Sequence, residues 1–216
     1  MRIFFVLIIG FMTCFGFEIK IIDKPIIFNE QRINLTKEYI KDHYGFDVDS
    51  INITPKIIVL HWTADMSFKR SFDRLNPPIL YSDRKDIANA SRLNVSAHFM
   101  VDRDGTIYRL MPETYMARHV IGLNYYSLGI ENIGGKNNKR EDLTKAQLES
   151  NIKLIRYLKN KYPTIEKLIG HYEYRDLEGS KYWLELDSSY RTKKRDPGKK
   201  FMKAIRERVA DLNLTK

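Results

Sequence analysis

Cysteine and long apolar runs are nearly absent from the sequence. The 216 residues include a single cysteine, Cys14, which excludes an intramolecular disulfide framework and a zinc cluster built from cysteines. No apolar run reaches the ~20 residues that a helix needs to cross a bilayer. The motifs His-Glu-x-x-His, Gly-x-Ser-x-Gly and Cys-x-x-Cys and the Walker loop are also missing. A catalytic site would therefore be assembled from residues that lie far apart in the sequence.

The composition is that of a folded, basic protein. Apolar residues make up 43% and aromatic residues 12%, so the chain is neither disordered nor of low complexity. Its length suits one domain with a core of its own. The 37 Lys and Arg against 27 Asp and Glu give a formal charge of +10, which raises nucleic acid as a partner. No RNA- or DNA-binding module is recognisable and the leader described next argues against that partner, so we expect no nucleic-acid binding.

The N-terminus is built like an export signal. One basic residue and then an apolar run over residues 3–17 precede the polar chain. We predict that residues 1–16 are an export signal, cut after Gly16, or a lipoprotein leader in which Cys14 is lipid-modified. The expected location is the periplasm or cell envelope, with membrane contact only through that lipid anchor. A buried N-terminal helix or strand is the alternative, and the run is short for a permanent transmembrane anchor.

Four segments predict the strands of a sheet. Residues 56–60 are a short apolar run rich in β-branched residues, typical of a strand buried on both faces. Residues 95–110 contain two strand-like runs around an Asp-Gly turn, the strongest hairpin signal in the sequence. Further strands are expected at residues 127–132 and 167–170.

Three segments predict helices. Residues 144–162 predict a helix that a Thr-x-x-Gln capping box opens, and residues 36–43 predict a shorter one. A last helix is expected to start at Pro197, with Asp196 as its N-cap. Residues 65–94 are expected to form a long loop with short local structure.

These elements predict the fold class. Strands and helices alternate along the chain, while the hairpin requires at least one antiparallel pair. The predicted fold is therefore α/β, a single domain in which helices flank a mixed central β-sheet. Residues 17–55 are expected to be an N-terminal extension to this domain.

The residues whose chemistry stands out lie at the ends of predicted strands. His61, Glu131 and His171 are placed at such ends, and Asp196 precedes a helix. Functional side chains converge at strand ends in sheet-based folds, and two histidines with a carboxylate suit a catalytic zinc that keeps a position open for water. Each residue also has a structural explanation: a hydrogen-bonded histidine, a solvated glutamate or a helix N-cap. The residue types and spacing alone leave both interpretations open.

Six short blocks occur in a fixed order along the chain. They are Ile-Val-Leu-His61-Trp-Thr-Ala, Val-Ser-Ala-His-Phe-Met-Val-Asp-Arg-Asp-Gly105, Ala-Arg-His119, Leu-Gly-Ile-Glu131, Ile-Gly-His171 and Lys194-Arg-Asp-Pro-Gly198. Together they resemble the zinc-dependent N-acetylmuramoyl-L-alanine amidase family, which includes the peptidoglycan recognition proteins and phage T7 lysozyme. The resemblance covers roughly residues 56–205, and implies an amidase domain at residues 56–212 with the peptidoglycan recognition protein-like fold.

The resemblance implies roles for individual residues. It implies one Zn²⁺ ion held by His61, His171 and Asp196, with Asp196 standing where some members have cysteine. It makes Glu131 the general base and acid, and Lys194 the residue that stabilises the transition state. Other members have a tyrosine at the position of Ala97, so Glu131 is expected to carry the proton transfer here.

Two further residues are implied to lie on the substrate side of the site, His119 and Trp62. His119 matches the histidine of a Trp-His-Ala-Gly block in the family. In this chain the block reads Arg118-His119-Val120-Ile121, which departs from that pattern.

The implied activity is hydrolysis of the amide bond between N-acetylmuramic acid and L-alanine, in peptidoglycan or in released muropeptides. The alternative is a non-catalytic peptidoglycan-binding module of the same fold. Binding-only relatives typically lose a zinc ligand, whereas this chain keeps all three. The basic run at residues 191–208 flanks the implied site and favours an anionic substrate, such as a stem peptide with free carboxylates. We expect a monomer.

Overall fold

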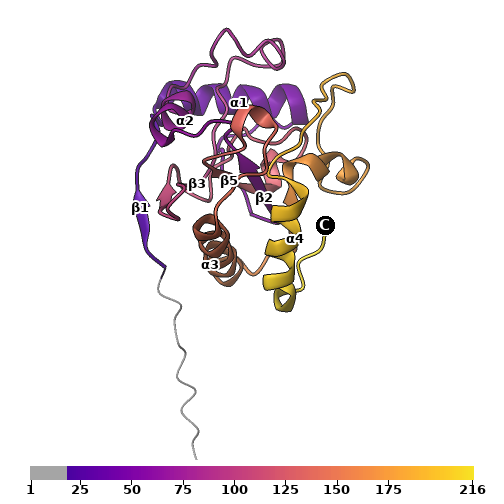
Figure 1. The fold of residues 1–216 in the computed structure, drawn as a ribbon. Coiled ribbons are helices and arrows are strands. Elements are labelled where there is room, and N and C mark those ends of the chain that lie inside the picture. The colour runs from indigo at the N-terminus through magenta and orange to yellow at the C-terminus, as the bar shows by residue number, and fades with distance from the viewer. Residues whose placement is uncertain (1–18) are drawn as a thin grey trace, which may run out of the picture.

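The computed structural model describes residues 19–216, which form one sheet with helices on both faces (Figure 1). The strands lie in the order β1-β4-β3-β5-β2-β6. The pairs β1·β4, β3·β5, β5·β2 and β2·β6 are parallel, and the pair β3·β4 is antiparallel. This mixed sheet confirms the predicted α/β class. The predicted leader at residues 1–16 lies outside the described residues.

The strand β2 (Ile57–Trp62) lies between β5 (Ser127–Asn132) and β6 (Lys167–Gly170). All six residues of β2 are buried, as expected for a strand that is covered on both faces. The strand extends past the predicted end at residue 60, so that His61 belongs to the strand itself.

The predicted hairpin consists of β3 (Phe99–Val101) and β4 (Ile107–Arg109), which pair antiparallel. The edge strand β1 (Ile21–Asp23) pairs with β4. The segment that we treated as an N-terminal extension therefore adds a strand to the sheet. Its apolar side chains also join the largest core cluster, among them Leu35, Tyr39, Ile40, Ile51 and Ile53.

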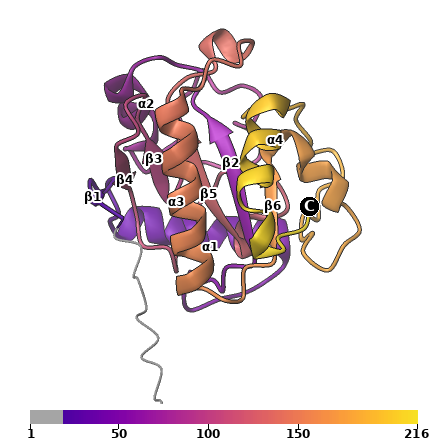
Figure 2. The ribbon, with the colours of Figure 1, turned by 60° about the horizontal axis from the view of Figure 1, so that its bottom comes forward.

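Within residues 19–216 the α-helices are α1 (Glu30–Tyr44), α2 (Phe68–Leu75), α3 (Lys145–Lys161) and α4 (Lys199–Arg208). Figure 1 shows α1 and α2 above the sheet and α3 and α4 below it, and Figure 2 shows α3 and α4 in front of the strands. Short 3₁₀ segments cover Asn124–Tyr126, Lys136–Asn138, His171–Leu177 and Ala210–Leu212. No helix in the described part of the chain has the length and apolar character needed to cross a membrane.

Helix starts show where local sequence signals suffice. The capping box predicted for α3 is present: the Thr144 side chain accepts from the Gln147 N–H at 3.1 Å, and the Gln147 side chain accepts from the Thr144 N–H at 2.9 Å. The helix α1 begins at Glu30, well before the predicted start at residue 36. Arg32 in its first turn is buried although it is charged. The apolar pattern that marks the inner face of a helix is therefore missing at this end. The helix α2 lies inside the segment that we expected to be mainly loop.

The start of α4 corrects one prediction. Asp196 is not the N-cap, because the helix begins at Lys199 after Gly198. The carboxylate of Glu141 instead accepts from the first two backbone N–H groups of the helix, at 3.2 and 2.9 Å. Gly198 has a φ of +95°, and a Cβ at this position would lie 2.5 Å from the Glu141 side chain. A residue from another part of the chain thus caps α4, and the Asp196 carboxylate is free for other contacts.

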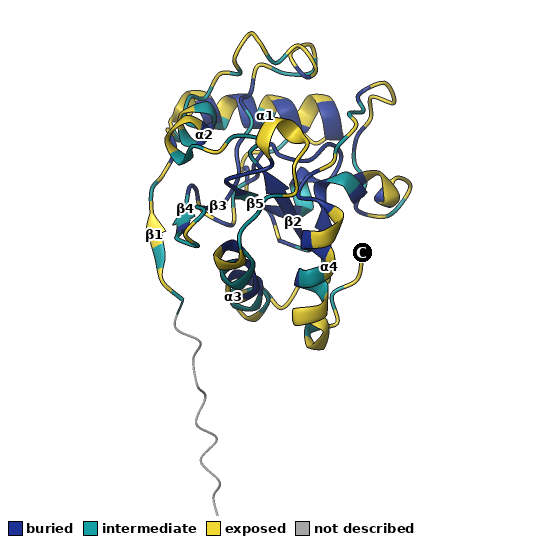
Figure 3. Ribbon diagram, viewed as in Figure 1, coloured by how far each residue is buried: buried dark blue, intermediate teal, exposed yellow. Residues whose placement is uncertain are grey.

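The two faces of β2 serve different purposes. Buried residues gather along the sheet and the inward faces of the helices (Figure 3). Ile58 and Leu60 belong to the cluster that contains the side chains of α3 and α4, whereas Ile57 and Val59 belong to a second cluster with loop residues. Because residues two apart on a strand share a face, His61 projects on the side of this second cluster.

Candidate active site

Strand register brings three of the predicted site residues together. In the parallel β2·β5 pair His61 lies opposite Glu131, so the two side chains project from the same face. In the β2·β6 pair Leu60 lies opposite Gly170, the last residue of β6, and His171 follows directly. The three side chains therefore meet at one edge of the sheet.

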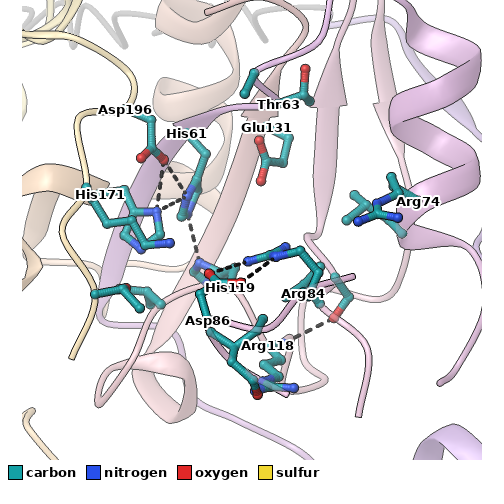
Figure 4. Close-up of a pocket in the computed structure, with 18 of the residues that line it drawn as sticks. His61, Thr63, Arg74, Arg84, Asp86, Arg118, His119, Glu131, His171 and Asp196 are labelled. Carbon is teal, nitrogen blue, oxygen red and sulfur yellow. Dashed lines mark hydrogen bonds and ion pairs between the residues drawn. The ribbon is translucent and has the colours of Figure 1, made fainter. Parts of the chain in front are cut away.

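Asp196 completes a buried triangle with the two histidines (Figure 4). The two Nδ1 atoms of His61 and His171 are 2.9 Å apart. The Oδ2 atom of Asp196 lies 3.2 Å from Nδ1 of His61 and 2.9 Å from Nδ1 of His171. Three potential metal-ligating atoms thus face a common point, and we call this group the metal triangle.

The protonation states of the metal triangle suit a cation. Burial lowers the pKa of His171 to about 3, so this imidazole is neutral at pH 7. Burial alone would raise the pKa of Asp196, but His171 and His61 together hold it well below its usual range, so the carboxylate is ionised. Each Nδ1 atom carries at most one proton, and the ionised carboxylate carries none. Hydrogen bonds can therefore form along at most two of the three sides of the triangle. A cation would satisfy all three atoms at once.

His119 lies behind His61. Its Nδ1 atom is 3.0 Å from Nε2 of His61, and its Nε2 atom is 3.2 Å from Oγ of Ser127. Gly129 of β5 makes room for the ring, because a Cβ there would lie 2.8 Å from it. Substrate contact by His119 stays a prediction. The contact that the structure shows is with His61, whose ring orientation it fixes.

Glu131 and Lys194 line the cleft beside the metal triangle. Burial raises the pKa of Glu131 to about 7. The neighbouring Asp196 carboxylate adds to this rise, and His61 opposes it. Its Oε2 atom is buried and has no hydrogen-bond partner within residues 19–216. Burial also lowers the pKa of Lys194, although Asp196 opposes the shift. A carboxyl with a pKa near neutrality and a free oxygen is suited to take up and return a proton.

The cleft around these residues has a volume of about 1130 Å³. Trp62 lines it at the end of β2, where its buried indole N–H donates to Oδ1 of Asn138 at 2.8 Å. Arg84, on the loop between α2 and β3, points into the cleft and pairs with Asp86 at 3.0 Å (Figure 4). Arg118 lies at its base, and is 2% exposed.

Sequence reasoning gave no role to Arg84, Asp86 or Arg118. Polar loop residues are usually solvated, and a single buried arginine leaves no periodic pattern, so neither position is marked locally. One signal was available. The block Arg118-His119-Val120-Ile121 departs from the family pattern at the position of Arg118.

The comparison with protein families decides what this site belongs to. The family model described as N-acetylmuramoyl-L-alanine amidase matches residues 52–199, which include the metal triangle, Glu131 and Lys194. The chain belongs to this family. Its enzyme class is that of amidases acting on the bond between N-acetylmuramic acid and L-alanine of peptidoglycan.

Solved structures share the fold of this amidase. The N-acetylmuramoyl-L-alanine amidase LysC from Clostridium intestinale URNW is 24% identical, with a TM-score of 0.53 over 89% of this chain and 99% of that chain. The amidase AmiD from E. coli, in complex with anhydro-N-acetylmuramic acid-L-Ala-D-gamma-Glu-L-Lys, is 19% identical, with a TM-score of 0.50 over 78% of this chain and 61% of that chain. At these identities the likeness establishes the fold. A comparison with curated protein sequences gives no match.

Proposed function

We propose that this amidase cleaves the N-acetylmuramoyl–L-alanine bond with one zinc ion held by His61, His171 and Asp196. The observation that carries the proposal is the metal triangle, whose sides measure 2.9, 2.9 and 3.2 Å, with Glu131 opposite His61 on the neighbouring strand β5. Two imidazoles and a carboxylate are a suitable donor set for catalytic zinc, with the fourth position left open.

The geometry of the metal triangle fits this ion. Zinc–ligand bonds of about 2.0–2.1 Å in a tetrahedral site place the ligand atoms about 3.3 Å apart. The edges of 2.9 to 3.2 Å are within a few tenths of an ångström of that value. His119 occupies the Nε2 atom of His61 and so leaves Nδ1 as the atom available to the metal.

Glu131 is the proposed proton carrier. Amide hydrolysis needs an activated water, a polarised carbonyl and a proton for the departing nitrogen. When bound, zinc lowers the pKa of water towards ~7 and withdraws charge from a carbonyl oxygen. Glu131, with its free Oε2 and a pKa of about 7, takes the proton from the water and delivers it to the leaving amine. Lys194, beside it in the cleft, stabilises the negative charge that develops on the carbonyl oxygen.

The proposed substrate is peptidoglycan or a released muropeptide. The AmiD complex supports this proposal, since that relative of the same fold was solved with a muramoyl peptide as its substrate. Cationic side chains along the cleft, among them Arg84, Arg191 and Lys193, suit the free carboxylates of a stem peptide. A binding-only module would need neither the metal triangle nor a free carboxyl beside it.

We also propose that the amidase is exported through residues 1–16 and acts as a monomer in the periplasm or at the cell envelope. The apolar leader supports export, either as a protein cut after Gly16 or as a lipoprotein through Cys14. The mass of the native protein tests this proposal. An intact Met1 on a cytoplasmic protein would refute export, and an acylated Cys14 would establish the lipoprotein.

Zinc content and wall digestion together test the proposed function. The purified protein should bind one zinc ion and release stem peptides with a free L-alanine amino group from purified sacculi. His171→Ala should lose metal and activity together, because one of the three ligand atoms of the metal triangle is removed. His98→Gln is the matched control: His98 is also buried, but its two ring nitrogens bond only to backbone atoms of Tyr115 and Gly129, so the variant should keep its zinc. A His171→Ala protein with full zinc occupancy would contradict the ligand assignment.

A further inference from the structure

Two segments without strands or α-helices form walls of the cleft. The first is the loop at residues 79–93, which an isolated antiparallel bridge between Ile79 and Leu93 closes at its base. The second is the segment at residues 178–195. Both line the cleft, the loop through residues 81–87 and the segment through residues 190–194. No backbone ladder holds these walls against the sheet. The N–H groups of Leu184 and Leu186 in the second wall donate to the carbonyls of Gly122 and His43, each at 2.9 Å, and side-chain contacts complete the positioning.

One buried arginine joins the two walls. The guanidinium of Arg118 donates to the backbone carbonyls of Ile87 at 3.1 Å, Ser91 at 3.2 Å and Leu93. It also donates to the hydroxyl oxygen of Tyr190, in the second wall, at 3.0 Å. A single side chain therefore binds three carbonyls of the loop and one residue of the other segment.

A histidine of α1 makes a second connection between the same walls. Nε2 of His43 donates to the carbonyl of Ala90 at 2.9 Å, and Nδ1 lies 2.9 Å from the carboxylate of Glu185. The rings of Tyr39 and His43 stack with their centroids 4.2 Å apart, and the Arg118 guanidinium lies 5.2 Å from the centroid of the Tyr39 ring. Tyr39 therefore contacts both residues that connect the walls. The end of the loop at residues 87–93 is thus fastened, while Arg84 and Asp86 project from it towards the cleft.

We propose that Arg118 is a positioning residue for the substrate, which holds the loop at residues 79–93 and the segment around Tyr190 in the arrangement that presents Arg84 to the cleft. The inference rests on the proposed function and adds to it a residue that touches neither the metal triangle nor Glu131. Arg84 lines the same cleft as Glu131 and the metal triangle. Where Arg84 stands therefore affects the space that a stem peptide enters.

The chemistry of the side chain explains why arginine is required. A guanidinium presents five N–H donors in a planar fork, whereas a lysine ammonium donates from a single point. A lysine ammonium has three N–H donors, so lysine at position 118 would leave at least one of the four acceptors unpaired in a buried site. An unpaired buried carbonyl is costly, so the loop would gain by moving towards water. The fastened arrangement would then be populated for only part of the time.

The proposal predicts a change in KM rather than in kcat. If Arg118→Lys leaves the walls in the fastened arrangement for one-tenth of the time, KM for a muropeptide rises about tenfold, because apparent affinity scales with the competent fraction. The kcat and the zinc content should stay within about twofold of the wild type, because Arg118 contacts neither Glu131 nor the metal triangle. The bonds between Thr192 and Tyr174, and between the Asp196 carbonyl and the Tyr172 N–H, hold Lys194 independently of Arg118.

Arg32→Lys is the matched control. Arg32 is also buried, at 1% exposed, and its guanidinium donates to four backbone carbonyls, those of Ile27, Leu75, Asn76 and Pro77. None of these lies in the fastened end of the loop or in the second wall. Arg32→Lys should therefore lower the thermal midpoint as Arg118→Lys does, but leave KM within about twofold.

Two readouts separate positioning from general stability. In Arg118→Lys, the amide hydrogens of the loop should exchange faster, while those of β2 and β5 should keep their wild-type rates. In Arg118→Ala, millimolar guanidinium ion should restore KM by occupying the vacated space, and it should have no effect on Arg32→Ala.

Four results would overturn the proposal: an unchanged KM in Arg118→Lys, an effect confined to kcat, an equal rise of KM in Arg32→Lys, or unchanged loop exchange. Failure of the proposed function gives a different result, a zinc-loaded wild type that does not cut sacculi. In that case loop exchange and the dissociation constant of a muropeptide still decide the role of Arg118.

Discussion

The edge of the sheet and the walls of the cleft are built in different ways. At the edge, His61, Glu131 and His171 owe their positions to the parallel register of β2, β5 and β6. That register rests on a ladder of backbone hydrogen bonds that no single side chain controls. Apart from the two backbone bonds of Leu184 and Leu186, the walls owe their positions to buried polar side chains, chiefly Arg118 and His43, which bind backbone carbonyls.

Different structural elements therefore position the reacting groups and the surfaces that contact the substrate in this amidase. Glu131, His61 and His171 stand on strands or directly after one, as a precise site requires, whereas Asp196 directly follows the second wall. The surfaces that would meet the substrate stand on loops, which vary more easily because few backbone bonds define them. Changes at the edge should therefore alter the chemical step, and changes in the walls should alter affinity and stability.

The largest effect is expected from Glu131→Gln, which tests the edge alone. The amide has almost the same shape but cannot accept the proton, so kcat should fall by roughly 10²–10⁴. Zinc content and wall binding should survive, since Glu131 is outside the metal triangle. Steady-state kinetics on a muropeptide and metal analysis check both halves. A variant that still cleaves within about threefold of the wild type would show that another base carries the proton.

A smaller effect is expected from Gly129→Ala, which disturbs the edge through packing. The new Cβ would lie 2.8 Å from the ring of His119, and would displace that ring from His61. Overpacking of this kind costs about 1–3 kcal/mol of stability, and loss of a residue that orients a ligand weakens metal binding about 10–100-fold. Zinc titration and urea unfolding measure the two effects.

A double-variant comparison identifies the route of that effect. If Gly129→Ala acts through His119, it should add little to the loss of zinc affinity in a His119→Ala background, where the ring is absent. Additive losses in the double variant would show that the strand, and not the histidine, transmits the change.

The smallest effect is a pH dependence that belongs to the walls. Burial alone lowers the pKa of His43, but its bonds to Glu185 and to the Ala90 carbonyl raise it above its usual value. The charged imidazole is therefore favoured in the folded state. Its contribution is complete below the unfolded pKa of about 6.5 and is lost as the pH rises through the higher folded pKa.

Urea unfolding of the wild type and of His43→Gln measures this contribution. The difference in the free energy of unfolding between the two proteins should shrink as the pH rises from about 5.5 to 8.5. His171, with a pKa of about 3, stays neutral in the folded protein over this range. Its titration in the unfolded chain at about pH 6.5 raises the stability of both proteins with pH, so it cancels in the difference between them. A difference that grows with pH would contradict the assignment.

The parts of the fold that could be predicted are those that depend on local sequence patterns. The hairpin around Gly105 and the capping box of Thr144 and Gln147 both follow from patterns a few residues long. The buried strand that carries His61 follows from its apolar run. The start of α1 could not be predicted in this way. Arg32 in its first turn is buried because its guanidinium donates to backbone carbonyls 43 to 45 residues away.

The candidate site shows the same division. The placement of His61, Glu131 and His171 at strand ends is visible in the sequence, and the six family blocks extended it to Asp196 and Lys194. The position of Asp196 before a helix suggested an N-cap as well, and only the structure shows that Glu141 performs this capping.

The alternation of strands and helices can be predicted from neighbouring residues, because local hydrogen bonding and side-chain periodicity depend on near neighbours. The order of the chemical groups along the chain is also visible in the sequence. The tertiary structure alone decided that Asp196 faces two histidines, that His119 orients His61 and that Arg118 joins two loops. These are buried polar groups, and each must find a partner wherever the fold brings one, often from a distant part of the chain. Such pairings leave no pattern in neighbouring residues.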